Sequence, residues 1–422
     1  MIEVNRLYKI LITILLILQF YFFDLIPKIN DWLINANSEY SKRIQFFIFL
    51  LMLVILFLSK KGTENVKMNF SVPIILFLII IPLIAWSSAR IYNQGIIDTI
   101  LKNYSYYLVI GYFPFSYFFS DRKNVRWFYM LLVKMAFVYL ILQNIQGIIF
   151  KLTYHIVLFY TPVAIQNLTI LQRLTEGTEI ITFVAVLISL KPFLFHEPWR
   201  KIDYLTIILI LTFDIFFSQG RMYLMIVIVA LSISGILQLY SSKFRSVVYI
   251  FTPFMLVILI FLFNKLVTSL NFTNTTGARA ASYIMRTYSY DYFYNHIFYN
   301  NWFGIGFPDI DQYKWLLKGS VGFDPGGGLM TSQDVGIVGT AGILGISSLV
   351  FFTMIFLKLL SMLASGINKR IILIVLVYLS MSLISLSPLD MGRIFPFILT
   401  LALCDFSQTA VIKKSAYKFY SN

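Results

Sequence analysis

Charged residues and metal-ligating residues are scarce in this sequence. Only 13% of its 422 residues are charged, and it has one cysteine and three histidines. Soluble domains average about 25% charged residues, so this scarcity argues against a water-soluble enzyme. The single Cys404 has no partner for an intramolecular disulfide. One cysteine and three histidines do not supply the closely spaced ligands of a structural zinc site, so we expect no metal site.

Hydrophobic residues are correspondingly abundant. They make up 59% of the chain, and the mean hydropathy is +0.80. A membrane-spanning helix needs about 20 residues, so this amount of apolar sequence would fill roughly twelve helices. The composition predicts an all-α, polytopic membrane protein in which residues 1–422 form a single integral membrane domain.

Hydrophobic runs separated by charged or proline-containing segments locate the predicted spans. We expect the first run to be retained, because no small-residue cleavage site of a signal peptide follows it. No internal repeat is visible, which weakens an inverted-repeat transporter interpretation. The predicted spans are residues 8–26, 44–59, 69–86, 104–119, 127–150, 178–195, 204–218, 222–240, 246–268, 336–360, 371–387 and 394–410.

Basic residues are distributed unevenly between alternate loops. The chain has 34 basic and 19 acidic residues, a net charge of +15. If the N-terminus is cytoplasmic, the segments on that side hold 19 basic and six acidic residues, and the others hold 15 and 13. Because cytoplasmic loops collect lysine and arginine, this pattern predicts cytoplasmic N- and C-termini. The positive charge therefore does not require a nucleic-acid partner.

One predicted loop is much longer than the others. Residues 269–335 form a large polar segment, rich in tyrosine, asparagine and glycine, which the predicted topology places outside the cytoplasm. Loops longer than about 12–15 residues are usually functional or disordered, and the aromatic content argues against a disordered linker. We therefore expect functional residues in this extracytoplasmic loop.

Arg221 follows a minimal connection, Ser218-Gln219-Gly220, between two predicted spans. A charged residue at the centre of a spanning helix costs about 2.5–3.5 kcal/mol on insertion scales, and less near the interface. One interpretation is an arginine that reaches the interface and caps a helical hairpin. The other is a cation that faces an outward cavity and stabilises an anionic substrate.

Arg279 and Arg286 are seven residues apart, so they would share one face if this segment is helical. Tyrosines, including Tyr283 and Tyr290, interleave with them. Arginine forks bind diphosphate bidentately and aromatic faces pack against sugar rings, so this mixture suits a phosphate-linked saccharide. The alternative is an interfacial aromatic belt with arginine anchors at the lipid headgroups.

Arg393 and Asp334 are further charged candidates on the predicted outer side. Arg393 lies in the last outer turn, and Asp390, three residues earlier, is expected to pair with it if its role is structural. Asp334 precedes a helix predicted to begin near Gly336. It is therefore either a base for an acceptor hydroxyl or an ordinary helix N-cap.

Four motifs, in order, resemble those of the O-antigen ligases and polysaccharide polymerases. They are Ser-Gln-Gly-Arg at 218–221, Thr-Gly-Ala-Arg at 276–279, Trp-Phe-Gly-Ile-Gly-Phe at 302–307, and the glycine-spaced helix after Asp334. The resemblance covers residues 214–360. Members of this family are polytopic enzymes that act outside the cytoplasmic membrane on glycans linked to undecaprenyl diphosphate.

The resemblance implies a glycosyltransferase of the bacterial cytoplasmic membrane that uses a polyprenyl-diphosphate-linked donor and no cofactor. Ligases of the family typically carry a His-Asn pair before the glycine-spaced helix. This chain has Ser332-Gln333-Asp334 there, which favours a polymerase of capsule, exopolysaccharide or O-antigen. The residues expected in the site are Arg221, Arg279 and Asp334 for catalysis, and Arg286, Arg393, Tyr283, Tyr290 and Trp302 for substrate binding.

Two other functions remain open. A ligase, which moves finished polymer to another acceptor, would share the same cavity. A flippase or other transporter of lipid-linked oligosaccharides should show charges buried mid-membrane on several helices. In the sequence the main mid-span charges are Lys134 and Asp214, which favours an enzyme. The expected partners are lipid-linked donor and acceptor glycans, membrane lipids, a flippase and a chain-length regulator, with no nucleic acid.

Overall fold

A computed structural model describes residues 2–26, 40–58, 66–153, 157–159, 177–240, 280–318, 332–366 and 368–419, together with single positions between these ranges. In these ranges the chain forms helices and turns and no strand. The elements are α1 (Ile2–Gln19), η1 (Phe22–Leu25), α3 (Tyr40–Leu58), α4 (Ser71–Ile91), α5 (Ile96–Lys102), η2 (Tyr104–Gly111), α6 (Tyr112–Phe119), α7 (Arg122–Thr153), α8 (Thr178–Phe195), α9 (Lys201–Thr212), η3 (Phe213–Ser218), α10 (Arg221–Leu239), α12 (Ala280–Asn295), α13 (Lys314–Lys318), η4 (Ser332–Val335), α14 (Gly336–Leu344), α15 (Ile346–Ala364), α16 (Lys369–Ser385) and α17 (Ile394–Phe419).

Six of the described helices, α3, α4, α7, α8, α10 and α15, are long and apolar enough to cross a membrane. The first part of α17, Ile394–Gln408, is a shorter apolar helix. Helices suit a lipid environment because their backbone N–H and C=O groups are paired within the segment. The all-helical prediction is confirmed for the described residues. The predicted count of about twelve spans and the extracytoplasmic placement of residues 269–335 are not confirmed.

Four predicted spans are interrupted in the structure. Residues 8–26 form the end of α1 and then η1, and residues 104–119 form η2 and then α6. Residues 204–218 form α9 and then the π-helical turn η3, and residues 336–360 divide at Gly345 into α14 and α15. Hydropathy is summed over a window, so it does not detect such changes of backbone conformation. The predicted span 246–268 lies outside the described residues.

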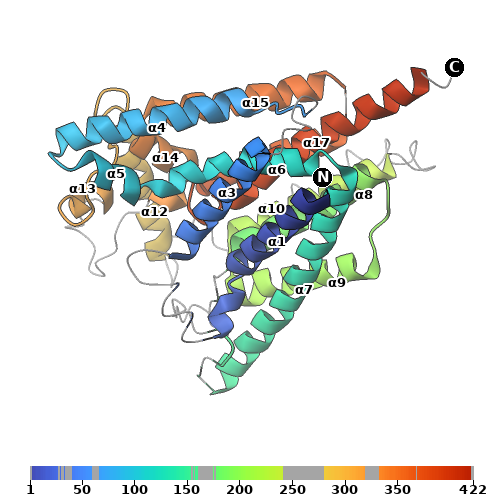
Figure 1. Ribbon diagram of the computed structural model, residues 1–422. Coiled ribbons are helices and arrows are strands. Elements are labelled where there is room, and N and C mark those ends of the chain that lie inside the picture. The colour runs from blue at the N-terminus through green and yellow to red at the C-terminus, as the bar shows by residue number, and fades with distance from the viewer. Residues whose placement is uncertain are drawn as a thin grey trace.

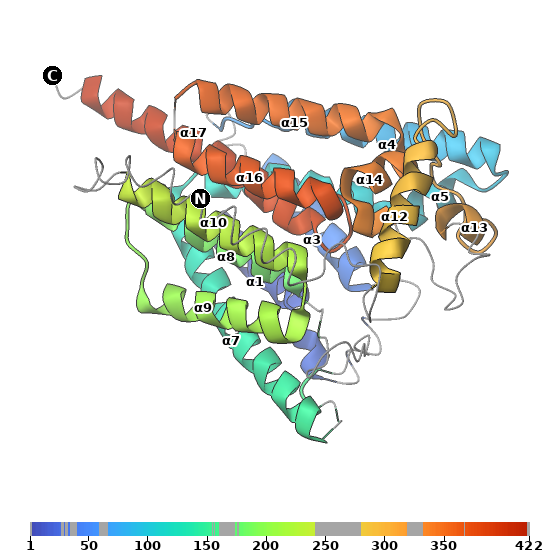
Figure 2. The ribbon, with the colours of Figure 1, turned by 180° about the vertical axis from the view of Figure 1, so that it is seen from behind.

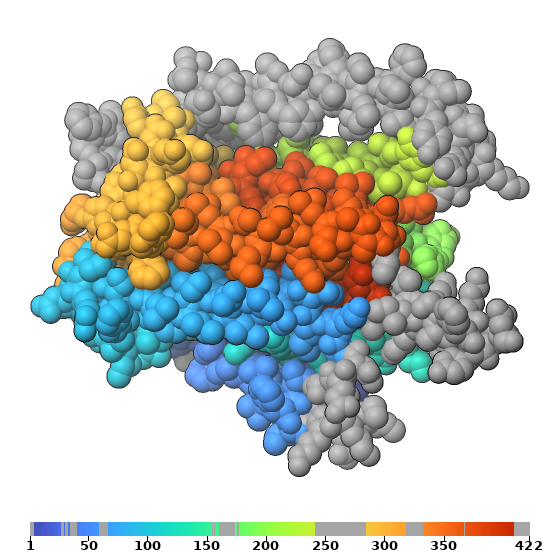
Figure 3. All heavy atoms as spheres, turned by 90° about the horizontal axis from the view of Figure 1, so that it is seen from above, coloured from blue at the N-terminus to red at the C-terminus, as the bar shows by residue number. Residues whose placement is uncertain are grey.

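The long helices run between two ends of the molecule. In Figure 1, α12 and α13 lie at the left end and the C-terminal end of α17 lies at the right. Figure 2 shows the same arrangement from behind. We call these the α12 end and the C-terminal end. On the face shown in Figure 3, α4 and α15 lie side by side, and α12 covers one end of this pair.

Helix α8 is the central element of this arrangement. Sixteen of its 18 residues are buried, and it packs against α7, α9, α10, α16 and α17. A helix that is apolar on all sides is either enclosed by protein or faces lipid, and its contacts place α8 in the first class. Its two charged residues, Glu179 and Lys191, lie toward its two ends.

The buried charge of α8 is compensated inside the bundle. Lys191 forms an ion pair with Asp203 of α9, and both side chains are 1% exposed. Tyr129 of α7 donates a hydrogen bond to the other Asp203 oxygen over 2.7 Å. A buried charge is tolerated only when it is paired and hydrogen-bonded, so this cluster joins α7, α8 and α9 near the C-terminal end.

Residues 302–307 pack against the break between α14 and α15. The Ile305 N–H donates to the Gly342 carbonyl over 2.8 Å, and the Ile346 N–H donates to the Trp302 carbonyl over 3.0 Å. Two of the motifs that carry the family resemblance are therefore in direct backbone contact. This contact gives their glycines a packing role that does not depend on catalysis.

Gly345 and Gly304 allow this close approach. Gly345 has φ +63° and ψ −151°, a region of backbone conformation that is essentially restricted to glycine. A Cβ built on Gly345 would lie 2.0 Å from the Trp302 carbonyl oxygen, and one on Gly304 would lie 2.5 Å from the Gly342 carbonyl oxygen. Any side chain at either position would force the two segments apart.

We expect Gly345→Ala to lower the free energy of unfolding by at least about 1–3 kcal/mol, the cost of the strained backbone alone. Gly235→Ala is the matched control, because a Cβ built on Gly235 in α10 meets no atom within 4 Å. That variant should be neutral or slightly stabilised. Thermal unfolding of the purified variants in detergent makes the comparison, and equal melting temperatures for the two variants would contradict this account.

Candidate functional site

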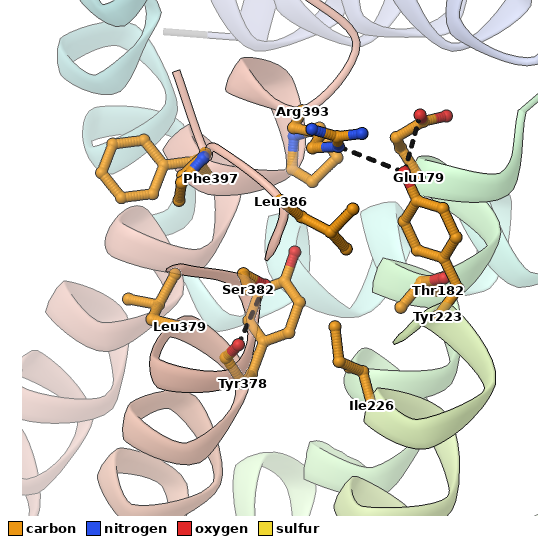
Figure 4. A pocket seen from close by; sticks show the side chains of 12 residues that line it. Glu179, Thr182, Tyr223, Ile226, Tyr378, Leu379, Ser382, Leu386, Arg393 and Phe397 are labelled. Atoms are coloured by element: carbon orange, nitrogen blue, oxygen red, sulfur yellow. Dashed lines mark hydrogen bonds between the residues drawn. The ribbon is translucent and has the colours of Figure 1, made fainter. Parts of the chain in front are cut away.

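A small hollow lies where the first turns of α8, α10 and α17 meet the last turns of α16 (Figure 4). Its volume of about 20 Å³ is enough for about one water molecule. Any larger ligand must therefore displace side chains. Apolar residues form much of the wall, and the polar or aromatic members of the lining include Glu179, Tyr223, Tyr378, Ser382, Arg393 and Phe397.

A chain of hydrogen bonds joins three helices at this hollow. Arg393 Nε donates to Tyr223 Oη over 3.1 Å, and Tyr223 Oη donates to Glu179 Oε1 over 2.9 Å (Figure 4). The Arg393 guanidinium also lies 6.0 Å from the centroid of the Tyr223 ring. A cation and a carboxylate are thus held near each other by one tyrosine. Glu179 and Arg393 carry opposite charges within the described lining.

Arg393 has two further partners in the described structure. Its Nη1 donates to the Asp390 carboxylate, and the same nitrogen donates to the Gln333 carbonyl over 3.1 Å. The expected pair between Arg393 and Asp390 is therefore present, and both side chains are less than a fifth exposed. The bond to Gln333 links the start of α17 to η4, the element that carries Asp334.

The start of α8 positions Glu179. Gly177 precedes the helix with φ +69°, and a Cβ built on it would lie 2.7 Å from Tyr139 Oη. Only glycine fits there, so the chain turns directly into α8 at Thr178. Glu179 then lies in the first turn, where the helix dipole favours negative charge. Its carboxyl group lies beside Gly392, because a Cβ built on Gly392 would be 3.6 Å from Glu179 Cδ.

The turn between η3 and α10 positions Tyr223. Gln219 takes the left-handed conformation with φ +51°, and α10 begins two residues later. A Cβ built on Gly220 would lie 2.8 Å from Tyr223 Cδ2, so the turn packs directly on the tyrosine ring. The hydroxyls of Ser218 and Thr178 are 3.5 Å apart, which links this turn to the start of α8.

Asp390 is the titratable group at the edge of the site. Burial raises the pKa of Asp390 from 3.8 to about 7, although the Arg393 guanidinium acts in the opposite direction. The nearby carboxylates of Asp334 and Glu179 raise this pKa further. Asp390 therefore changes charge near neutral pH. When it is protonated, the charge of Arg393 is less compensated and attracts an anion more strongly.

Two of the predicted site residues, Arg393 and Asp334, lie at or near the hollow. A third, Arg221, is close in sequence to a residue of its lining. Arg393 lines the hollow, and Asp334 is near enough to raise the pKa of Asp390. Asp334 lies in the 3-10 helix η4, so the predicted helix begins after it as expected. Arg221 is the first residue of α10, two residues before Tyr223, and its side chain is half-buried.

The other predicted site residues are separate from the lining of the hollow. Arg286, Tyr290 and Trp302 are exposed on α12 or in the turn after it. The Tyr290 ring stacks on Tyr294, with 6.5 Å between centroids. α12 packs against η4 and α14, so these residues belong to the same end of the molecule. Arg279 and the side chain of Tyr283 lie outside the described residues.

Sequence reasoning missed Glu179, Tyr223 and Tyr378. Glu179 carried a usable signal, because it is an acidic residue in the first turn of a predicted span, two residues after Gly177. Tyr223 and Tyr378 carried none, since tyrosines are frequent throughout this chain. Their roles depend on contacts between distant segments, which residue spacing does not reveal.

The described residues contain no group of three or more His, Cys, Asp or Glu side chains that could hold a metal ion. Comparison with known proteins finds no matching family model and no curated protein of similar sequence. The family resemblance consequently rests on the four sequence motifs alone.

The raised pKa of Asp390 predicts a specific pH dependence of stability. Between about pH 4 and 7 the folded protein holds a proton that the unfolded chain releases, so stability falls as the pH rises, by at most about 1.4 kcal/mol per pH unit. Above pH 7 this contribution is constant. We expect the stability difference between the native protein and Asp390→Asn to decrease from pH 4 to 7, measured by thermal unfolding. A constant difference across this window would refute the assignment.

Proposed function

We propose that this protein is an extracytoplasmic polymerase of oligosaccharide repeat units linked to undecaprenyl diphosphate. It would act in the bacterial cytoplasmic membrane, with both termini in the cytoplasm, and make a capsular, exopolysaccharide or O-antigen chain. The observation that carries the proposal is the Arg393–Tyr223–Glu179 chain at the ends of apolar helices. The four sequence motifs and the charge distribution support it.

In the proposed reaction the two charged residues of the hydrogen-bond chain, Glu179 and Arg393, have different roles. A hydroxyl of the acceptor glycan attacks the anomeric carbon of the donor, and the bond between that carbon and the diphosphate oxygen breaks. The acceptor proton passes to Glu179, and undecaprenyl diphosphate leaves with the bonding electron pair. Arg393 stabilises the negative charge that develops on the diphosphate. Fixed cations in a water-poor site are usually a large contribution to such catalysis, and a positioned base adds a further factor.

Tyr223 acts as a positioning residue in this scheme. It accepts a hydrogen bond from Arg393 and donates one to Glu179, so it sets the distance between the cation and the base. Arg221 and Arg279 are proposed to contribute additional positive charge toward the diphosphate, and Asp334 is the alternative base. A substrate must open the hollow, because its present volume is that of one water molecule.

The acceptor glycan is proposed to lie along α12. Its exposed Tyr290 and the nearby Trp302 offer aromatic faces, and Arg286 supplies a cation on the same helix. Aromatic rings pack well against the apolar faces of sugar rings, and the polar edges of those sugars remain hydrated. Tyr283, whose side chain lies outside the described residues, is a further proposed contact of the glycan. A flippase that supplies donor and a chain-length regulator are the proposed partners.

One observation favours the transporter alternative. Asp214 in η3 is 1% exposed, and neither of its carboxyl oxygens has a hydrogen-bond partner among the described residues. An ionisable residue buried in a membrane protein commonly marks an ion or substrate pathway. Lys134, the other mid-span charge, is exposed on α7 and gives no such support.

Deletion of the gene separates the candidate functions. A polymerase predicts outward-facing single repeats on the lipid with no long chains. Long chains that remain on the lipid would indicate a ligase, and repeats trapped on the cytoplasmic side would indicate a flippase. Mass analysis of lipid-linked glycans from the two sides of the membrane distinguishes these outcomes.

Arg393→Gln should reduce the rate of polymer formation by about 10²–10³-fold, as does the loss of one fixed group that stabilises transition-state charge. Arg393→Lys should recover only part of the rate, because lysine lacks the planar fork of donors. The rate is the amount of polymer formed per unit time by membranes that contain equal amounts of folded protein.

Lys102→Gln is the matched control for this series. Lys102 is also paired with an aspartate, Asp309 at 2.7 Å, but its side chain is half exposed. Loss of such a surface pair costs about 1 kcal/mol or less, so the rate should be unchanged. Equal rates for Arg393→Gln and Lys102→Gln would remove Arg393 from the proposed site.

A further inference from the structure

A second and larger pocket lies at the C-terminal end of the bundle. It has a volume of about 600 Å³, within the range of about 300–1,000 Å³ that is usual for ligand sites. Its lining residues come from the end of α8 and the α8–α9 connection, the end of α10, and the α15–α16 connection with the start of α16. We call it the basic pocket, and its lining includes Phe193, His196, Gln238, Lys369, Arg370 and Ile371.

The basic pocket lies far from the hollow that contains Arg393. Both are formed by α8, α10 and α16, but by opposite ends of these helices. Glu179 of the hollow and Phe193 of the basic pocket are 14 residues apart on α8. At 1.5 Å per residue this corresponds to about 20 Å along the helix. A ligand in one pocket therefore does not contact the other.

Glu197 is the one acidic residue in the described lining of the basic pocket, and it does not balance the basic residues there. Glu197 forms ion pairs with Arg126 and with Arg200, the latter over 3.0 Å, so two arginines outside the lining compensate its charge. Lys369 and Arg370 remain as two exposed cations on the opposite wall. The pocket therefore favours an anion.

Arg370 contacts an aromatic ring in the lining of the basic pocket. Apolar side chains form one side of that pocket. The Arg370 guanidinium lies 5.7 Å from the centroid of the Phe193 ring, a cation–π contact across two elements. Asn368, in the left-handed conformation with φ +50°, donates its side-chain amide to the Ser407 carbonyl and so anchors the connection before α16. Phe193 and Ile371 supply apolar surface beside the cations. The pocket thus combines a basic wall with an apolar one.

We propose that the basic pocket binds the phosphate group of an anionic phospholipid. It lies where apolar helices long enough to cross a membrane end, which is the depth of the lipid headgroups. Basic pockets between the ends of membrane helices are suited to phospholipid headgroups. Lys369 and Arg370 contact the phosphate, and Phe193 and Ile371 contact the glycerol and upper acyl carbons. The bound lipid joins the ends of α8, α10 and α16.

Binding of phosphatidylglycerol by the delipidated protein tests this proposal. We expect phosphatidylglycerol to raise the melting temperature and to bind at least tenfold more tightly than phosphatidylcholine. The double variant Lys369→Gln/Arg370→Gln should lose this preference. Retained lipid measured by mass spectrometry gives an independent readout, because the variant should keep no more phosphatidylglycerol than phosphatidylcholine.

The matched control is Lys123→Gln/Lys201→Gln, which removes two exposed lysines outside the lining of the pocket. It should keep the preference for phosphatidylglycerol. Equal loss in the two double variants would mean that general surface charge, not this pocket, attracts the lipid, and would overturn the proposal. A second experiment adds inorganic phosphate in place of the lipid. If phosphate alone raised the melting temperature as much as phosphatidylglycerol, the ligand would be a free anion and the lipid assignment would be wrong.

Discussion

The enclosure of α8 is the constraint on which the rest of the structure depends. A helix with 16 of 18 residues buried needs neighbours on every side, and five other helices supply them. Polar groups are costly in such surroundings unless they are paired. The two charged residues of α8 lie toward its ends, where Glu179 bonds Tyr223 and Lys191 pairs with Asp203. The candidate site and the basic pocket lie at opposite ends of this helix.

Arg393 is the residue through which this packing forms the proposed site. It contacts α10 through Tyr223, η4 through the Gln333 carbonyl and its own turn through Asp390. A side chain held by three elements is preorganised, so little reorganisation is needed when charge develops beside it. The hollow next to it holds about one water molecule, so the proposed substrate must displace side chains of its wall.

The sequence predicted the helical class and many of the helices, because apolar runs of spanning length leave few other structures. It also predicted the pair between Arg393 and Asp390, which are three residues apart. It could not predict the bond from Arg393 to Tyr223, because 170 residues separate them. The break at Gly345 was missed for a different reason. Glycine occurs both inside membrane helices and at breaks, and only the contact with residues 302–307 shows which applies here.

The central claim is that this protein joins lipid-linked repeats, and reconstitution tests it most directly. The purified protein would be placed in vesicles with an undecaprenyl-diphosphate-linked repeat, and the glycans would be analysed by mass over time. The account predicts a ladder of longer glycans, with one undecaprenyl diphosphate released for each repeat joined. Repeats that remain single but cross the bilayer would contradict the account and would identify a transporter.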